Sequence, residues 1–338
     1  MISKRYAHTA TLLRDGRVLV TGGCCISGAV LAKSELFDPE TGAWAATGSL
    51  AQGRYMHTAT LLADGRVLVT GGTAAGTTLF ASAEVYDPET GAWTPTGSML
   101  ARRVLHTATL LPDGTVLVAG GEGGLGTLSS AEIYHPDTGM WTAAAEMPMD
   151  RAQQTATRLL DGTVLLAGGN AVSGSVAASV LYDPVSGSWS AAGDLVDPRV
   201  SHTATLLLDG RVLLAAGNAD SGLHASAELY DPDSRTWTAV ASLLTGRTVH
   251  SATLLTDGSV LVVGGATTRH FEFVGAAERY DPQTGLWTQA GSSLVYRSAH
   301  TATLLDDGRV LVAGGLTYIP DATALSQAAV AELYQPGG

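Results

Sequence analysis

Six histidines recur at one position of the sequence, and imidazole groups could bind a metal ion or transfer protons there. Neighbouring repeats are 48 to 50 residues apart. A residue that recurs in nearly every repeat serves the repeated structure first, because a ligand site breaks the symmetry of a repeat. We therefore expect a structural role, with a ligand-binding subset or a metal site as the alternatives. The seven positions are His8, His57, His106, Gln154, His202, His250 and His300.

Glutamate recurs on the predicted third strand of the same repeats, and its exception coincides with the exception among the histidines. The fourth repeat has Val180 at the glutamate position and Gln154 in place of histidine. This shared exception predicts that the histidine and the glutamate of one repeat form a charge-assisted hydrogen bond, which would raise the pKa of the imidazole. The glutamates are Glu35, Glu84, Glu132, Glu228, Glu278 and Glu332.

An arginine stands three residues before each of the seven histidine positions. Such regularity indicates a structural role, and we expect hydrogen bonds to backbone carbonyls or to an acidic residue of a neighbouring repeat. Arg102 is an additional arginine in this segment, and with Arg269 it could bind an anion. The repeated arginines are Arg5, Arg54, Arg103, Arg151, Arg199, Arg247 and Arg297.

Four short strands in each repeat must position these residues. The repeat reads R-x-x-H-T-A-T-L-L-x-D-G-R-V-L-V-x-G-G, then a variable loop, then A-E-L-Y-D-P-x-T-G-x-W. The residues after the histidine predict the first strand, and an Asp-Gly hairpin turn leads to the second. Ala-Glu-Leu-Tyr predicts the third strand, and a turn that begins with Asp-Pro leads to a tryptophan strand. This period and strand content are typical of propeller blades.

The pattern of Gly-Gly after an apolar strand, then a spaced tyrosine and a spaced tryptophan, resembles the Kelch superfamily in its bacterial, galactose-oxidase-like branch. The resemblance implies an all-β fold, a seven-bladed propeller with four antiparallel strands per blade. It covers 1–338 as a single domain, with blades that start near residues 8, 57, 106, 154, 202, 250 and 300. Kelch propellers include oxidases, epimerases, plant specifier proteins and protein-binding adaptors, so the fold alone selects no function.

The seventh repeat lacks its tryptophan strand in this sequence. It runs out at Tyr334-Gln335-Pro336-Gly337-Gly338, while the six tryptophans of the chain all belong to the earlier repeats. An uncovered strand edge invites pairing with another strand. We therefore expect either a fragment of a longer protein or a seventh blade without its outer strand.

The loops of the expected propeller divide between two faces. The Asp-Gly and Asp-Pro turns are short and uniform, whereas the loops after Gly-Gly and the segments before the first strands vary. The variable face is therefore the expected binding face. Its residues either contact a peptide, glycan or protein ligand or pack on one another over the channel. The candidate ligand-binding residues are Tyr6, His8, Tyr55, His57, Glu122, Asn170, Asn218, Arg269, Phe271, Phe273 and Tyr318.

Composition and motifs narrow the classes of function. The net charge is −12 and the chain has no basic patch, so no nucleic-acid partner is expected. No apolar run approaches the roughly 20 residues that span a bilayer, so no membrane partner is expected. We expect a monomer without a cofactor. The hypotheses are a non-catalytic binding propeller, a fragment or engineered scaffold without a ligand, and a metal-independent isomerase, lyase or cyclase.

Two local features bear on metal and redox chemistry. Copper-radical oxidases of this superfamily place a Tyr-His pair before the first strand, but no tyrosine directly precedes a repeated histidine here. We therefore expect no such oxidase activity and no metal. The adjacent Cys24 and Cys25 could be inert thiols, a vicinal disulfide, or a redox or metal site.

Overall fold

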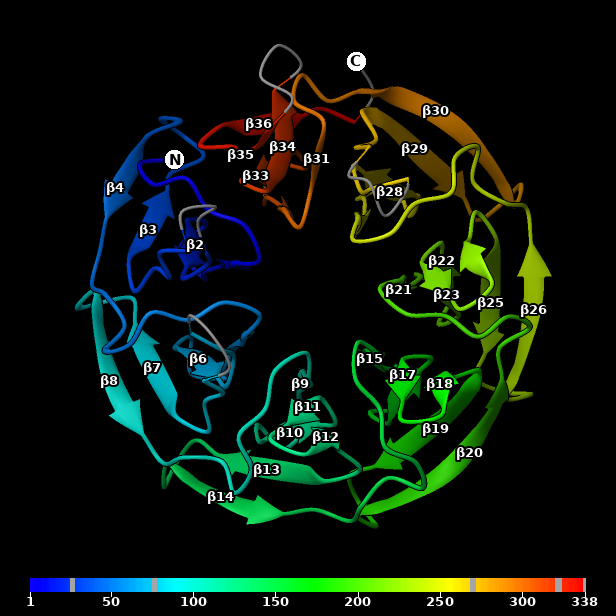
Figure 1. Ribbon diagram of the computed structural model, residues 1–338, viewed down its shortest axis with the longest axis horizontal. Helices are drawn as coiled ribbons and strands as arrows, with labels where there is room; N and C mark the ends of the chain where they lie inside the picture. The colour runs from blue at the N-terminus through cyan, green and yellow to red at the C-terminus, as the bar shows by residue number, and fades with distance from the viewer. Residues whose placement is uncertain (25–27, 75–77, 268–271, 320–323, 337–338) are drawn as a thin grey trace.

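The computed structural model describes residues 1–24, 28–74, 78–267, 272–319 and 324–336. Seven antiparallel sheets surround a central axis as the blades of a propeller (Figure 1). Each sheet follows chain order, with its first strand nearest the axis. The expected all-β, seven-bladed architecture is therefore confirmed. No helix that could cross a membrane occurs within the described residues.

The first two strands of every blade come directly from the repeat. The first strands are β1 (Thr9–Leu12), β5 (Thr58–Leu61), β9 (Thr107–Leu110), β15 (Thr155–Arg158), β21 (Thr203–Leu206), β27 (Ser251–Leu254) and β32 (Thr301–Leu304). The second strands are β2 (Val18–Thr21), β6 (Val67–Thr70), β10 (Val116–Ala119), β16 (Val164–Ala167), β22 (Val212–Ala215), β28 (Val260–Val263) and β33 (Val310–Ala313).

The outer strands follow the variable loops. The third strands are β3 (Ser34–Phe37), β7 (Ala83–Asp87), β13 (Ala131–His135), β19 (Ala178–Asp183), β25 (Ala227–Asp231), β29 (Ala276–Asp281) and β36 (Ala331–Tyr334). The fourth strands are β4 (Trp44–Ala46), β8 (Ala92–Thr96), β14 (Met140–Ala143), β20 (Ser188–Asp194), β26 (Thr236–Val240) and β30 (Leu286–Ser292).

Short strands also form within the variable face. Three loop hairpins consist of β11 (Glu122–Gly123) with β12 (Gly126–Thr127), β17 (Asn170–Ala171) with β18 (Gly174–Ser175), and β23 (Asn218–Ala219) with β24 (Gly222–Leu223). A three-stranded sheet beside blade seven consists of β31 (Arg297–Ser298), β34 (Leu316–Ile319) and β35 (Ala324–Gln327).

The core lies between neighbouring blades. Every residue of the seven second strands is buried, because each face of such a strand packs against an adjacent blade. These runs of valine and leucine suit a fully buried strand. Farther out, the tyrosine or phenylalanine of each third strand contacts the tryptophan of the fourth, with ring centroids 4.9–5.2 Å apart in blades one to six.

Blade seven closes the ring against blade one with three strands, β32, β33 and β36, in the described part of the chain. Val18 and Val20 of blade one share an apolar cluster with Leu311 of blade seven. The Gly315 amide also donates to the carbonyl of Arg5 at 2.9 Å. The expected absence of an outer strand in this blade is thus confirmed for the described residues. The circle is closed by packing and hydrogen bonds between blade seven and blade one.

Candidate functional site

The residue before each histidine position adopts a left-handed backbone conformation. The φ angles of these seven residues lie between 51° and 56°. This conformation is costly for residues other than glycine, and most of all for a β-branched residue such as Val249. We call the seven residues the mouth ring: Ala7, Met56, Leu105, Gln153, Ser201, Val249 and Ala299.

Backbone hydrogen bonds join the mouth ring from blade to blade. Five of the seven amides donate to the carbonyl of the ring residue in the preceding blade, and the bond from Ala7 to Ala299 joins the first blade to the last at 3.0 Å. The repeated geometry offsets the local strain and holds seven side chains around the axis. The other bonds run from Met56 to Ala7, Gln153 to Leu105, Val249 to Ser201 and Ala299 to Val249.

A cavity of about 480 Å³ opens at this ring. It is lined by the mouth ring and by the six repeated histidines with Gln154. The residue preceding each mouth-ring residue pairs with the residue that follows Gly-Gly, as in the Tyr6–Cys24 and Ala152–Asn170 bridges. The cavity therefore lies on the variable face, where the sequence predicts the binding surface.

The mouth ring has an apolar arc and a short polar arc. Going around the axis, Val249, Ala299, Ala7, Met56 and Leu105 are consecutive and apolar. The remaining two blades contribute Ser201 and Gln153, whose side chains form a 2.8 Å hydrogen bond from Oγ to Oε1. No charged side chain lines the cavity among the described residues. The mouth can therefore receive an uncharged, largely apolar group.

The repeated histidines connect neighbouring blades, and the predicted hydrogen bond between histidine and glutamate is wrong. His57 Nε2 lies 3.0 Å from the Thr9 hydroxyl, and His8 Nε2 lies 3.1 Å from that of Thr301. The same contact with a threonine or serine of the preceding blade recurs for His106, His202, His250 and His300. Gln154 replaces it with a 2.9 Å bond from Nε2 to the carbonyl of Ala119.

Burial keeps these imidazoles neutral, which reverses the predicted sign of their pKa shift. Loss of hydration, followed by repulsion from the nearby Arg54, lowers the pKa of His57 to about 3. The pKa values of His106, His202, His250 and His300 are also lowered to about 3, and that of His8 lies well below its usual value, with burial as the main cause. At neutral pH these six histidines are therefore uncharged.

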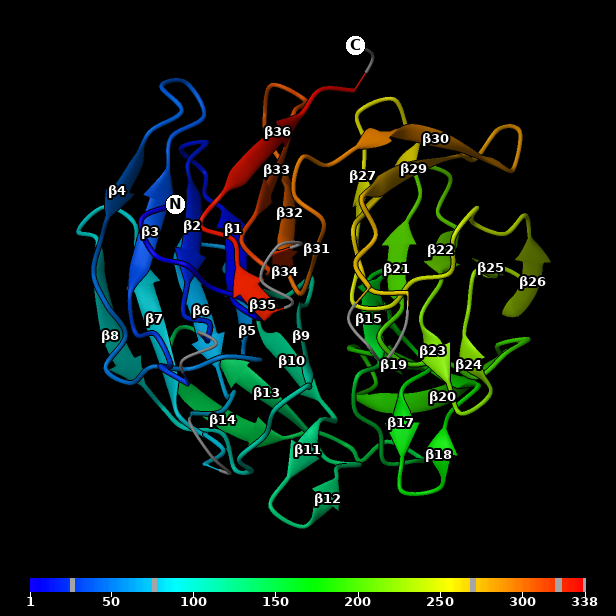
Figure 2. The same cartoon turned by 45° about the horizontal axis from the view of Figure 1, so that its top comes forward.

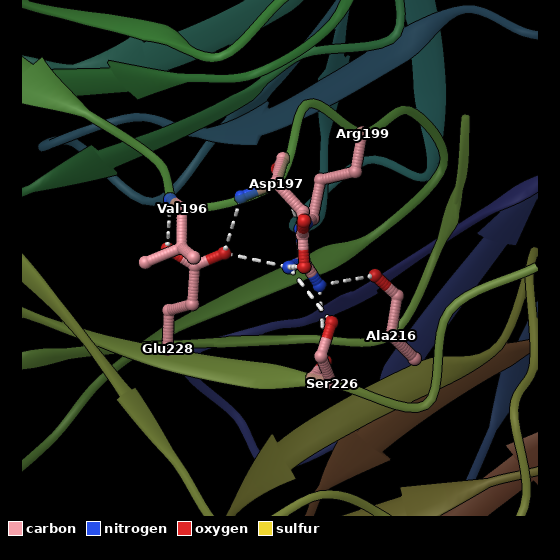
Figure 3. Close-up of polar contacts among 6 residues, drawn as sticks. All are labelled: Val196, Asp197, Arg199, Ala216, Ser226 and Glu228. Atoms are coloured by element: carbon pink, nitrogen blue, oxygen red, sulfur yellow. Dashed lines mark hydrogen bonds and ion pairs between the residues drawn. The ribbon is translucent and has the colours of Figure 1, made fainter. Parts of the chain in front are cut away.

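The glutamates instead pair with the repeated arginines of their own repeats (Figure 3). In blade five, Arg199 Nη2 donates to Glu228 Oε1 at 2.6 Å, and Nη1 donates to the carbonyls of Ala216 and Ser226 at 3.0 Å. Six blades have this ion pair, with both partners largely buried. The expected bonds to carbonyls are present. We expected the acidic partner of each arginine to come from a neighbouring repeat, but it comes from the same repeat as the arginine.

Each glutamate also accepts a hydrogen bond from the backbone three residues before the arginine. The donors Ile2, Ala51, Leu100, Val196, Leu244 and Leu294 lie 2.6–2.8 Å from a carboxylate oxygen. The carboxylate thereby fastens the segment before the first strand to the third strand. Because that segment leads directly into the mouth ring, the buried ion pairs fix the geometry of the cavity.

Blade four lacks both the carboxylate and the backbone donor of this network, although it keeps the arginine, whose Nη1 donates to the carbonyls of Gly168 and Ala178. Val180 replaces the acceptor, and Pro148, which has no N–H, occupies the position of the backbone donor. Arg151 is fully buried, and its Nη2 has no partner within the described residues. Burial lowers the pKa of Arg151 to about 10. The exception at Val180 thus belongs to the arginine network, and the exception at Gln154 belongs to the separate histidine network.

The structure places the sequence candidates in two zones of the variable face. His8 and His57 line the cavity, whereas Tyr6, Tyr55, Glu122, Asn170 and Asn218 form bridges just outside the mouth ring. Asn218 Oδ1 accepts a 2.9 Å hydrogen bond from Thr248 Oγ1. Phe273 is buried and bridges to Ala266.

Three candidates and the cysteine pair are only partly covered by the structure. Arg269 and Phe271 lie outside the described residues, as does Cys25. Tyr318 belongs to β34, with its side chain outside the described part. Cys24 is buried and forms a bridge with Tyr6. A bound anion at Arg102 and a disulfide at the cysteines stay predictions.

Sequence reasoning placed the mouth-ring residues on the variable face but did not select them as candidate ligand-binding residues. Its members differ widely in type although they directly precede a recurring histidine, and this variability beside a recurring residue was the available signal. Larger clefts occur between the uniform turns of the opposite face, including one of about 710 Å³ lined by Arg17 and Asp64. The arginines that follow the Asp-Gly turns there form ion pairs within their own turns, as in Arg17–Asp15 and Arg66–Asp64.

The cavity does not have the ligand set of a copper centre. The Nε2 atoms of the histidines already contact hydroxyl groups of the preceding blades, and no tyrosine among the described residues lines the cavity. No group of three or more histidine, cysteine, aspartate or glutamate side chains suited to a metal occurs in the described parts of the chain. We derive no metal chemistry from these residues.

Known proteins share the repeat and the fold of this chain. The Kelch motif model matches residues 54–100 and 103–148. A fungal alcohol oxidase of the AA5 family, solved with copper, superposes with a TM-score of 0.79 at 21% identity, over 98% of this chain and 74% of the oxidase. The protein YjhT superposes with a TM-score of 0.68 at 17% identity, over 86% of this chain and 99% of YjhT. No curated protein matches the sequence. Likeness at these identities shows the fold alone.

Proposed function

We propose that this propeller, which carries matches to the Kelch motif, is a non-catalytic binding protein whose partner inserts an apolar side chain into the mouth ring. The observation that carries this proposal is the uncharged cavity of about 480 Å³ at the centre of the variable face. Ligand sites are generally concave and mostly apolar, with a few polar groups that fix the orientation of the ligand.

The state of the histidines favours binding over acid–base catalysis. A general acid or base works best with a pKa near the operating pH. The pKa of His57 and of four other repeated histidines is about 3, and their Nε2 atoms contact neighbouring blades. The histidines therefore stabilise the contacts between neighbouring blades and line the cavity.

The arrangement of the mouth ring favours a peptide or protein segment over a glycan. Five consecutive blades contribute Val249, Ala299, Ala7, Met56 and Leu105, and none of these is an aromatic platform. A projecting leucine-like or methionine-like side chain would bury apolar area against this arc. Polar backbone groups of the same segment would face Gln153 and Ser201, the two polar members of the ring.

The proposal is tested by selection from a phage-displayed library of random peptides against the full chain. We expect selected peptides to share an apolar anchor and to bind the Met56→Glu variant about tenfold or more weakly, since a buried anchor dominates such interfaces. Met149→Glu is the matched control, because Met149 and Met56 are both 39% exposed but only Met56 lines the cavity. Peptides without an apolar anchor, or equal binding to both variants, would contradict the proposal.

A further inference from the structure

We propose that the propeller has a second interaction surface, on the face opposite the mouth ring, which binds a basic and apolar peptide segment of a partner protein. Figure 2 shows the loop hairpins β11–β12 and β17–β18 projecting from the variable face. The Asp-Gly turns join the other ends of the first and second strands, so they lie on the opposite side, which we call the turn face. Because the first strands are nearest the axis, the residues directly before these turns surround the axis on that face. They are Arg14, Ala63, Pro112, Leu160, Leu208, Thr256 and Asp306.

Four consecutive blades contribute apolar, exposed residues to this circle, and we call them the turn arc: Ala63, Pro112, Leu160 and Leu208. Leu160 is 73% exposed and Leu208 is 71% exposed. A Cβ built on Gly210 would lie 3.1 Å from Leu160 Cδ1, and one built on Gly258 would lie 3.0 Å from Leu208 Cδ1. Each leucine thus lies against the Asp-Gly turn of the next blade, so members of the arc are neighbours in space. Contiguous exposed apolar side chains with a polar border are typical of interaction sites.

The fold itself does not require leucine at these two positions. The preceding residues, Leu159 and Leu207, are 4% and 2% exposed and belong to the apolar core. Three other blades have Arg14, Thr256 and Asp306 at the position of the exposed leucines. The blade therefore accepts a polar side chain here, and two adjacent exposed leucines indicate contact with another molecule.

The carboxylates beside the middle of the turn arc lack the arginine partners that other blades provide. The residue after Asp-Gly is an arginine paired with the turn's aspartate in four blades, but it is Thr115 in blade three and Thr163 in blade four. Asp113 and Asp161 accept hydrogen bonds from these threonines at 2.7–2.9 Å and form no ion pair within the described residues. Arg158, at the end of β15, donates instead to a backbone carbonyl of blade three at 3.0 Å. The negative charge of both turns is therefore available to a cation.

A cavity of about 180 Å³ lies at one end of the turn arc, between blades two and three. Its lining includes Ala63 of the arc together with Asp113 and Asp137. A lysine or arginine side chain combines an apolar stem with a cationic head, so it complements this lining. An apolar residue of the same segment would then contact Leu160 or Leu208.

Charge decides among the possible occupants of the turn arc. A second copy of this chain, with its net charge of −12, would bring the same carboxylates together, and like charges oppose association. Nucleic acids and anionic lipid surfaces would be repelled in the same way. A basic segment of a partner protein gains apolar contact with Leu160 and Leu208 and attraction to Asp113 and Asp161, so both properties of the surface favour it.

The test selects phage-displayed random peptides on the full chain and removes those that also bind a Leu160→Ser/Leu208→Ser double variant. We expect the retained peptides to combine lysine or arginine with apolar residues. Labelled synthetic copies should bind the double variant about tenfold or more weakly in fluorescence anisotropy. Leu100→Ser/Leu244→Ser is the matched control, because both leucines are 66% exposed and lie outside the turn arc. No retained peptide, retained peptides without a basic residue, or equal weakening by the control would overturn the proposal.

Charge variants test the electrostatic part of the proposal with the same labelled peptides. Asp113→Asn and Asp161→Asn should each weaken binding about threefold, and added salt should weaken it further, since the charges are exposed. Asp194→Asn, at the opposite end of blade four, is the control and should have no effect. Met56→Glu should also leave binding unchanged, so failure here and failure at the mouth ring are separate results. Binding that is indifferent to Asp113 and Asp161 would overturn the proposal. So would self-association, measured by sedimentation velocity, that the leucine double variant abolishes, because it would assign the arc to a second copy.

Discussion

Arg199 and Glu228 form a buried ion pair within blade five, with 2.6 Å between Nη2 and Oε1, and this contact ties the start of the blade to its third strand. The carboxylate also accepts the amide of Val196 at 2.7 Å. Both charged groups are thereby satisfied although they lie away from solvent. The same ion pair and the same backbone hydrogen bond recur in six blades. The arginine–glutamate pair is therefore the main polar contact that stabilises the blades.

Loss of one carboxylate should therefore be costly. We expect Glu228→Ala to reduce the free energy of unfolding by about 3–5 kcal/mol, because it leaves the Arg199 guanidinium buried without its counter-ion. Asp209→Ala removes the exposed ion pair with Arg211 and should cost about 1 kcal/mol or less. Urea denaturation of both variants measures the difference. Equal costs would show that the buried pair has no special role.

Blade four provides the complementary prediction. Val180→Glu should be neutral or stabilising, because the new carboxylate would lie where Arg151 Nη2 now has no partner in the described residues. Leu181→Glu is the control: Leu181 and Val180 are equally buried and each belongs to an apolar cluster, but only Val180 stands at the position where the other blades have the glutamate that pairs with the arginine. That control should lose several kcal/mol, since the new charge has no partner. Thermal unfolding of the two variants checks this. Similar destabilisation by both would contradict the role assigned to Arg151.

These networks show which parts of the structure the sequence could predict. The blades, their strands and the missing outer strand at Tyr334 follow from turn signals and apolar strands that recur with one period. The partner of Glu228 does not, because Arg199 and His202 recur with the same period, and blade four, which keeps the arginine but lacks the histidine, pointed to the wrong one. Only three-dimensional placement separates the two networks.

The left-handed backbone of the mouth ring was beyond prediction for a different reason. Left-handed backbone is normally signalled by glycine or asparagine, but Met56, Leu105 and Val249 have low preference for it. Contacts between blades impose this conformation. Local propensity therefore gives no indication of the residues that form the cavity.

A second left-handed position offers a stabilising substitution. Ala216 has a φ of 57° where the other six blades have the first glycine of Gly-Gly, with φ between 61° and 67°. A Cβ built on Gly22 would lie 2.5 Å from the carbonyl oxygen of Arg54 and 2.7 Å from His57 Cε1, so this position is also crowded. We expect Ala216→Gly to raise the free energy of unfolding by about 1 kcal/mol, through relief of backbone strain. Gly168→Ala, the reverse change in blade four, should destabilise. The midpoints of urea unfolding decide whether both signs are right.

The neutral histidines should make the propeller sensitive to acid. In the unfolded chain a histidine binds a proton with a pKa near 6.5, whereas the pKa of folded His57 is about 3. Between these values the unfolded state binds more protons, so stability is complete above pH 6.5 and declines as the pH falls toward 3. Each such histidine contributes up to about 1.4 kcal/mol per pH unit in this window.

Substitution of one histidine isolates this contribution. Gln154 already occupies the equivalent position in blade four, where it bonds to Ala119, so we expect His57→Gln to fold. Its stability should fall less steeply between pH 6.5 and pH 4, by up to about 1.4 kcal/mol per pH unit relative to the unaltered chain. Urea unfolding at several pH values measures both slopes, and the carboxylates contribute equally to each. Identical slopes would mean that His57 is not held neutral by its burial between the blades.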